Sequence, residues 1–177
     1  MVLTRFTGSG SRNLVEIAKE LVNDPASNRW DNAPHGYKNI IPDKSFNETI
    51  FDNFYASNVY FDIGRWDEVI FTDGEIENCL FFGSQLFMSE FSAIDISDTH
   101  FDSSALSGAK FRSCNFRNTI FFGCSLVDVL FEECVFKNVV FSDNNLKAGC
   151  DLDGVVFKEC EIDSNTNRSI SLTTRDQ

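Results

Sequence analysis

A large apolar residue stands at every fifth position of this chain from residue 46 onward. Counting in fives gives 21 positions, and 20 of them are large and apolar: Phe46, Phe51, Ala56, Phe61, Trp66, Phe71, Ile76, Phe81, Leu86, Phe91, Ile96, Phe101, Leu106, Phe111, Phe116, Phe121, Leu126, Phe131, Phe136, Phe141 and Leu146. After one extra residue the spacing resumes at Leu152, Phe157 and Ile162. An α-helix repeats its apolar face about every 3.6 residues and a strand every two, so neither element explains a period of five.

The residue two positions before each large residue is usually small, as at Gly64, Ser84, Cys114 and Thr119. This pattern resembles the pentapeptide-repeat family, whose motif is loosely Ala-(Asp/Asn)-(Leu/Phe)-x-x, and the resemblance covers residues 46–164. It implies an all-β solenoid, a right-handed quadrilateral β-helix in which four units make one coil. We therefore expect about six stacked coils, because a single coil cannot bury its own inward side chains.

Four units per coil predict a second period of twenty residues. The four expected columns are Phe46, Trp66, Leu86, Leu106, Leu126 and Leu146; Phe51, Phe71, Phe91, Phe111, Phe131 and Leu152; Ala56, Ile76, Ile96, Phe116, Phe136 and Phe157; and Phe61, Phe81, Phe101, Phe121, Phe141 and Ile162. The extra residue near 147–151 is expected to form a bulge at a corner, with no longer insertion in the repeats. Local distortion is expected where the motif fails, at Phe54, Ala56, Ile94 and Asn144.

Non-repeat segments flank the repeats. Residues 1–45 are expected to form a helix and loop that cap the first coil, because Leu14, Ile17, Ala18 and Leu21 share one face of a helix over 13–22. Trp30, in the following loop, is a candidate plug for the open end. Residues 46–164 form the predicted β-helix, and residues 165–177 are predicted to be a polar tail that adds a partial coil or stays without regular structure.

Several outward positions carry apolar residues that the repeat does not require. They lie on the face of the fourth column and around the corner on the face of the first, and they form a candidate partner surface of Tyr60, Leu80, Phe82, Phe87, Ile120, Phe122, Val127 and Val140. Two alternatives are scattered surface residues and cover by the N-terminal segment. A homodimer through the fourth face is a further alternative.

Charge is also uneven along the chain, whose net charge is −12. Residues 43–103 contain 13 Asp/Glu and two Lys/Arg. The candidate acidic surface there consists of Asp52, Asp62, Asp67, Glu68, Asp73, Glu75, Glu77, Glu90, Asp95, Asp98 and Asp102. It is interpreted either as a solubilising surface or as a mimic of DNA phosphates that docks on a basic protein. Direct binding of nucleic acid is not expected from so acidic a chain.

Residues typical of catalysis or metal binding do not cluster in the sequence. The six Cys fall almost wholly at the small inward position, and the two His, His35 and His100, have no ligand-like spacing. No catalytic, cofactor or metal site is predicted, so the chain is not expected to be an enzyme. The first thirty residues lack a long apolar run, which predicts a cytoplasmic protein with reduced thiols and no membrane segment.

The resemblance also suggests a function. Some acidic members of the pentapeptide-repeat family bind DNA gyrase or topoisomerase IV and protect it, so the resemblance implies a binding protein that acts on a DNA-binding enzyme by mimicry. One alternative is an immunity or antitoxin-like protein that holds a cognate toxin or effector through the apolar fourth face. The other alternative is a structural spacer or assembly module.

Overall fold

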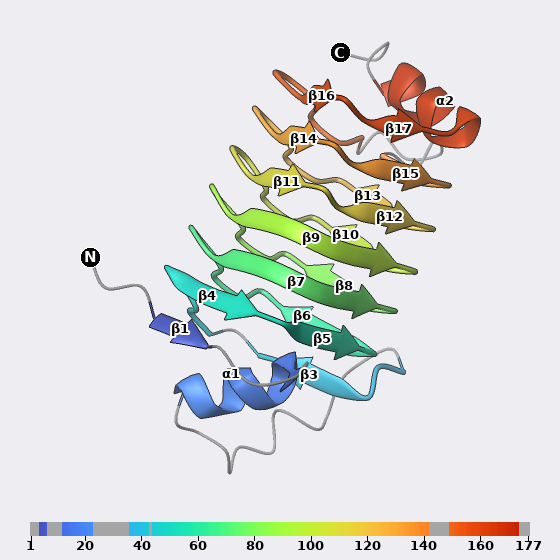
Figure 1. The fold of residues 1–177 in the computed structure, drawn as a ribbon. Coiled ribbons are helices and arrows are strands. Elements are labelled where there is room, and N and C mark those ends of the chain that lie inside the picture. The colour runs from blue at the N-terminus through green and yellow to red at the C-terminus, as the bar shows by residue number, and fades with distance from the viewer. Residues whose placement is uncertain (1–3, 7–11, 23–35, 43, 142–148, 174–177) are drawn as a thin grey trace.

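The computed structural model describes residues 4–6, 12–22, 36–42, 44–141 and 149–173. They form a parallel β-solenoid of about five turns with a short helix at each end (Figure 1). The elements in chain order are β1 (Thr4–Phe6), β2 (Arg12–Asn13), α1 (Leu14–Val22), β3 (Asn39–Ile41), β4 (Thr49–Asp52), β5 (Phe54–Ser57), β6 (Val59–Asp62), β7 (Ile70–Glu77), β8 (Leu80–Phe82), β9 (Glu90–Ser97), β10 (His100–Asp102), β11 (Lys110–Arg112), β12 (Asn115–Arg117), β13 (Ile120–Phe122), β14 (Leu130–Glu132), β15 (Val135–Lys137), β16 (Val156–Lys158), β17 (Glu161–Ile162) and α2 (Ser164–Thr173).

The strands stack with the predicted register of twenty residues, and this gives the rod four faces. The second and third faces belong to one 12-stranded sheet, and the fourth is a 5-stranded sheet of β13-β10-β8-β6-β3. The first face is held by single parallel bridges, such as Arg65 to Gln85 and Gln85 to Ala105. Inward side chains of one coil therefore rest on the equivalent side chains of the next.

Phenylalanine stacking fills the interior. On the fourth face the ring centroids of Phe61 and Phe81 are 4.0 Å apart with an interplanar angle of 9°. The column continues through Phe101 and Phe121 at centroid spacings of 4.7 and 4.8 Å and ends at Phe141 after a further 5.0 Å. These rings are wholly buried. The spacing of these nearly parallel rings matches the rise of one coil. Ring stacking and backbone pairing between coils therefore favour the same distance.

The chain turns at residues with left-handed backbone conformation, two positions after each large residue. Asn53, Asn58 and Asn78 have φ values of 53°, 57° and 49°. Asn, Asp and Gly tolerate this region better than other residues, which explains their frequency there. At the corner after β15 and β12, Asn138 Nδ2 donates to Asn118 Oδ1 at 3.0 Å, so these corner side chains also link the coils.

The small inward residues do more than leave room for rings. Cys114 Sγ donates to the carbonyl oxygen of Phe91 at 3.5 Å, and Ser104 Oγ donates to that of Phe81 at 3.1 Å. Each such bond joins a residue to the carbonyl 23 positions earlier, in the coil below. Ser, Thr and Cys are therefore favoured at this position because they combine small volume with a hydrogen-bond donor.

The expected distortions take a specific form. Phe54 is buried, and a Cβ placed on Gly74 would lie 2.5 Å from Phe54 Cε1, so the glycine in one coil makes room for the large residue in another. Gly74 pairs with Ile94, and both β7 and β9 run as continuous eight-residue strands through this corner. Ala56 lies buried within β5. Asn144 lies outside the described residues.

The predicted register after Phe141 is wrong. Phe157 stacks on Phe131 with a centroid distance of 5.1 Å, not on Phe136, and Ile162 pairs with Phe136 rather than Phe141. The parallel bridge from Ser125 to Asp151 likewise places Leu152 on Leu126, in the first column. The interval is 26 residues instead of 20, so six extra residues lie between Phe141 and Leu152 where one was expected. The described residues form about five turns where about six coils were expected. Leu146, assigned to the first column, lies outside the described residues.

The N-terminal segment extends the solenoid as well as capping it. Strands β1, β2 and β3 pair in parallel with β4, β5 and β6. Helix α1 matches the predicted helix, with Leu14, Ile17 and Ala18 buried and the Asn13 side chain accepting from the backbone N–H of Val15 at 2.8 Å. Trp30 lies outside the described residues.

Helix α2 stands where a polar tail was expected. Its first turn is capped by Asp163, whose Oδ1 accepts from the N–H of Thr166 and whose Oδ2 accepts from that of Asn138, both at 2.8 Å. Thr166 Oγ1 and Ser169 Oγ accept from the N–H groups of Val139 and Phe141, each at 2.9 Å. Hydroxyl groups of the helix thus bind the backbone N–H groups of Val139 and Phe141 at the end of the fourth face, and Ile170 also packs against the core.

Candidate functional site

Outward side chains of the fourth face form two columns over β3, β6, β8, β10 and β13. One column pairs Ile40, Tyr60, Leu80, His100, Ile120 and Val140, and the other pairs Asp62, Phe82, Asp102 and Phe122. The predicted apolar residues are therefore aligned, but a histidine interrupts the first column and acids alternate with Phe in the second. This face is less uniformly apolar than its sequence suggested.

Part of the fourth face is already covered. Tyr60 is only 6% exposed, and its ring centroid lies 6.1 Å from that of Tyr37 and 6.2 Å from that of Phe82. Burial, with smaller contributions from Asp62 and Asp102, raises the pKa of Tyr60. Phe82 remains 37% exposed. Cover by the N-terminal segment, one of the alternatives, thus applies to Tyr60, while Phe82 stays accessible.

The first face carries a groove that the sequence did not reveal as one. Phe87 is 41% exposed and Met88 is 66% exposed, and Val127 lies two coils further along. The groove has a volume of about 330 Å³ and is lined by Asp67, Glu68, Phe87, Met88, Ser107, Gly108, Val127 and Asp128. Its apolar residues and its carboxylates occur in one hollow, so two of the candidate partner residues, Phe87 and Val127, do share a site.

The predicted acids do not form one surface. Asp52 and Glu90 lie on the second face, Glu75, Glu77 and Asp95 on the third, Asp62 and Asp102 on the fourth, Asp67 on the first, and Glu68, Asp73 and Asp98 at corners. Together they form a collar around the first coils. Several are hydrogen-bonded within the rod: Asp95 accepts from Asn115 at 2.6 Å, and Asp98 accepts from Asn118 at 3.0 Å.

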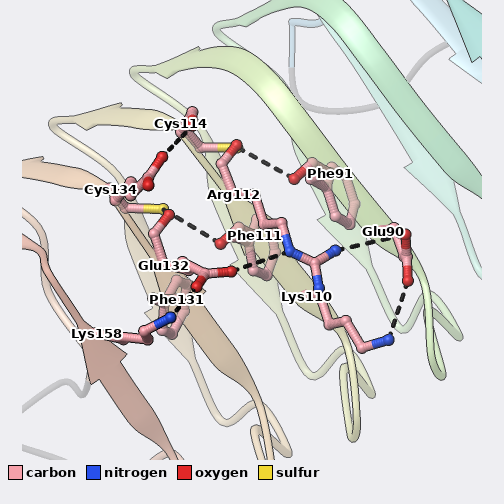
Figure 2. Close-up of polar contacts among 12 residues, drawn as sticks. Glu90, Phe91, Lys110, Phe111, Arg112, Cys114, Phe131, Glu132, Cys134 and Lys158 are labelled. Atoms are coloured by element: carbon pink, nitrogen blue, oxygen red, sulfur yellow. Dashed lines mark hydrogen bonds and ion pairs between the residues drawn. The ribbon is translucent and has the colours of Figure 1, made fainter.

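Glu90 belongs to an ion-pair column on the second face (Figure 2). Lys110 Nζ and Arg112 Nη1 lie 3.0 and 3.6 Å from its carboxylate. Arg112 Nε lies 3.1 Å from Glu132 Oε2, and Glu132 also pairs with Lys158. These cations lower the pKa of Glu132, chiefly through Lys158. Glu90 is therefore neutralised inside a structural contact between coils, and it presents a weaker field to a partner than its charge implies.

The cysteines occupy the inward positions that the sequence predicted. Cys114 and Cys134 stand one coil apart, and Cys160 continues their column. Cys124 and Cys150 form a second column that the wrong register concealed. None of the six described cysteines forms a disulfide. Burial raises the pKa of Cys79 to about 12, and contact with Cys134 together with burial raises that of Cys114, so these thiols are poor nucleophiles.

Among the residues that the structure describes, no group of three His, Cys, Asp or Glu could hold a metal ion, and His100 is an exposed residue of β10. His35 lies outside the described residues. No helix within the described ranges is long and apolar enough to cross a membrane.

Comparison with known proteins gives one family match. Residues 89–128 match the model for pentapeptide repeats in eight copies. The same five-residue spacing and the same stacked coils continue on both sides of the matched segment. No curated protein matches the chain in sequence.

Three solved structures are similar to this chain at low sequence identity. The pentapeptide repeat protein Rfr23 from the cyanobacterium Cyanothece 51142 is 13% identical, with 71% of this chain and 82% of that chain covered and a TM-score of 0.31. HetL, a pentapeptide repeat protein involved in heterocyst differentiation regulation from Nostoc sp. strain PCC 7120, is 10% identical (84% and 94% covered, TM-score 0.24). QnrB1, a plasmid-mediated fluoroquinolone resistance protein, is 14% identical (77% and 98% covered, TM-score 0.22).

Proposed function

The chain is a pentapeptide-repeat protein, and from this premise we propose that it is a non-enzymatic binding protein that acts on a protein partner through its outer surface. The observation that carries the proposal is the division of side chains: stacked rings fill the interior, while acids and a few apolar residues face outward. Outward columns repeat with each coil at about 4.8 Å, so they offer a partner a regular surface.

The acidic collar favours a basic partner, and a DNA-binding enzyme such as gyrase or topoisomerase IV fits that description. Residues 43–103 carry a net charge of −11, from 13 acids and two cations. A field of one sign raises the rate of encounter with an oppositely charged protein and opposes like-charged ones. Mimicry of DNA phosphates is the form of binding that this charge supports.

Gyrase supercoiling, assayed with and without the protein, tests the proposal. We expect the protein to change the supercoiling rate or to protect gyrase from a quinolone, with an effect that weakens as salt increases. A variant with three neutralised third-face acids should need more protein for the same effect, whereas a control with three neutralised acids at the other end should not. The variant is Glu75→Gln, Glu77→Gln and Asp95→Asn, and the control is Asp153→Asn, Glu159→Gln and Glu161→Gln. Absence of both binding and protection would refute the mimicry.

A second candidate is an immunity-like protein that holds a cognate toxin or effector. It is favoured by Phe82, which stays exposed beside the otherwise partly covered fourth face. Replacing Phe82 and Phe122 with Ser should then abolish the complex while leaving the fold intact, since both side chains point outward. The same variant tests a homodimer. If these rings form the dimer contact, sedimentation would show a dimer for the unaltered protein and a monomer for the variant.

A further inference from the structure

The groove on the first face results from two small residues between larger ones. Ser107 lies between Phe87 and Val127 in one outward column, and Gly108 lies between Met88 and Asp128 at the adjoining corner. A Cβ built on Gly108 would lie 3.4 Å from Met88 Cγ, so the Met88 side chain borders the hollow over Gly108. Apolar side chains form the walls of the groove and small residues form its bottom, which suits one inserted apolar side chain.

Both ends of this groove are acidic. Asp67 and Glu68 lie at one end and Asp128 at the other, and no Lys or Arg in the described part of the chain lines the groove. Arg65 pairs with Asp67 Oδ2 at 3.3 Å, but Asp67 Oδ1 is shielded from solvent and has no hydrogen-bond partner among the described residues. Asp67 is thus engaged within the rod, and the exposed Glu68 and Asp128 carry the end charges that a ligand would meet.

A second copy of this chain is a poor occupant. Each copy carries a net charge of −12, and a contact between two such grooves would bring their acidic ends together. Like charges at an interface oppose association. A cationic segment of another protein meets both the charges at the ends and the apolar middle.

The spacing of the coils defines that segment. Glu68 and Asp128 are three coils apart, about 14 Å at about 4.8 Å per coil. In an extended strand, residues i and i+4 are about 13 Å apart and point to the same side, as does residue i+2. We propose that this groove binds an extended segment of a protein partner with the pattern cation–x–apolar–x–cation, its apolar side chain inserted over Ser107 and Gly108. The inference rests on the proposed binding function and specifies the site and the partner chemistry.

An NMR titration of the full chain with a synthetic peptide tests this inference. The probe is acetyl-Gly-Lys-Ser-Leu-Ser-Lys-Gly-amide. We expect saturable shifts of the amides of Phe87, Ser107, Gly108 and Val127, and at least tenfold weaker binding when Ser replaces the central Leu, since burying a Leu is worth more than the 1.4 kcal/mol of a tenfold change. No saturable shift at about millimolar peptide, or shifts centred on another face, would overturn it. Binding that survives loss of the Leu would also overturn it, because charge alone would then suffice.

Two variants test the site without relying on stability. Ser107→Phe should fill the groove and abolish peptide binding, since the side chain lies outward between Phe87 and Val127. Glu68→Asn with Asp128→Asn removes the end charges, and both residues have left-handed φ values, 58° and 57°, where Asn is well tolerated. This pair should weaken binding at least tenfold.

The matched control is Asp73→Asn with Glu133→Asn. These are also acids at corners, with φ values of 52° and 55°, but they lie away from the groove. The control should bind the peptide as the unaltered protein does, and equal weakening in both pairs would show a general charge effect and refute the site. If gyrase protection persists in Ser107→Phe, the groove inference fails while the proposed function stands. If the peptide binds as predicted but gyrase is unaffected, the choice of gyrase fails instead.

Discussion

Replacing the inward pair Gly64 and Trp66 tests whether the size of one core residue determines the size of its neighbour. In the first column Trp66 stands where the next coils have Leu, and Gly64 stands where they have Ser84, Ser104 and Cys124. A Cβ on Gly64 would lie 2.5 Å from Trp66 Nε1 and 3.3 Å from two ring carbons. Because Gly64 does not have a positive φ, this clash is the main obstacle to a side chain there.

The expected energies follow from that geometry. Gly64→Ser alone should destabilise the protein by about 3 kcal/mol, the upper part of the usual range for overpacking, because the contact is with a rigid ring. Trp66→Leu alone should cost about 2 kcal/mol, because lost packing against Phe46 and Phe61 is partly offset by removal of a buried indole N–H that has no partner among the described residues. The double variant recreates the pair of the next coil, so its cost should be about 1–3 kcal/mol less than the sum.

Urea unfolding of the four proteins in this cycle measures the coupling. The free energy of unfolding of the double variant should exceed the value expected from adding the two single effects by about 1–3 kcal/mol. Additive effects, with a coupling below about 0.5 kcal/mol, would refute the view that Gly64 is small because Trp66 is large.

Three further predictions follow from individual residues. Changing Ile63 to Asn should stabilise the protein by about 1 kcal/mol in urea unfolding. The reason is that a β-branched residue is strained at the φ value of 45° found there, whereas Asn tolerates it. Asp163→Asn should cost about 1 kcal/mol near neutral pH, because the amide keeps one oxygen for the Thr166 N–H but puts an NH2 group where the second oxygen accepts from the Asn138 N–H. Because hydrogen bonds from Thr166 and Asn138 lower the pKa of Asp163, its contribution is present above the unfolded value of about 3.9 and is lost as pH falls through the folded value, so the variant should lose less stability in acid. Cys79 should resist a thiol reagent at about pH 8 until the protein unfolds, as mass spectrometry would show.

The repeated core could be predicted from the sequence because each coil repeats the same spacing of large inward residues. Columns such as Phe61 to Phe141 follow from counting alone, and the structure confirms them. The error after Phe141 arose because Leu146, although outside the described residues, continues the five-residue spacing in sequence. Spacing alone cannot show whether such a residue belongs to a column, whereas the bridge from Ser125 to Asp151 depends on three-dimensional pairing.

The ends and the surface were less predictable. Helix α2 attaches through hydroxyl groups such as Thr166 and Ser169, which leave no apolar period in the sequence. The neutralisation of Glu90 requires residues 20 and 22 positions away to meet it in the next coil, and the cover on Tyr60 comes from Tyr37 outside the repeats. The groove at Ser107 was missed because a hollow depends on the neighbours of a small residue rather than on the residue itself.

Affinity capture from the native host, read by mass spectrometry, tests the central claim that this rod binds a protein partner through its outer surface. The unaltered protein, the Ser107→Phe variant and the variant with neutralised third-face acids would serve as parallel baits. We predict that a basic or DNA-binding protein is enriched in stoichiometric amount by the unaltered protein and is lost with at least one variant. Equal recovery of every protein by all three baits would contradict the claim.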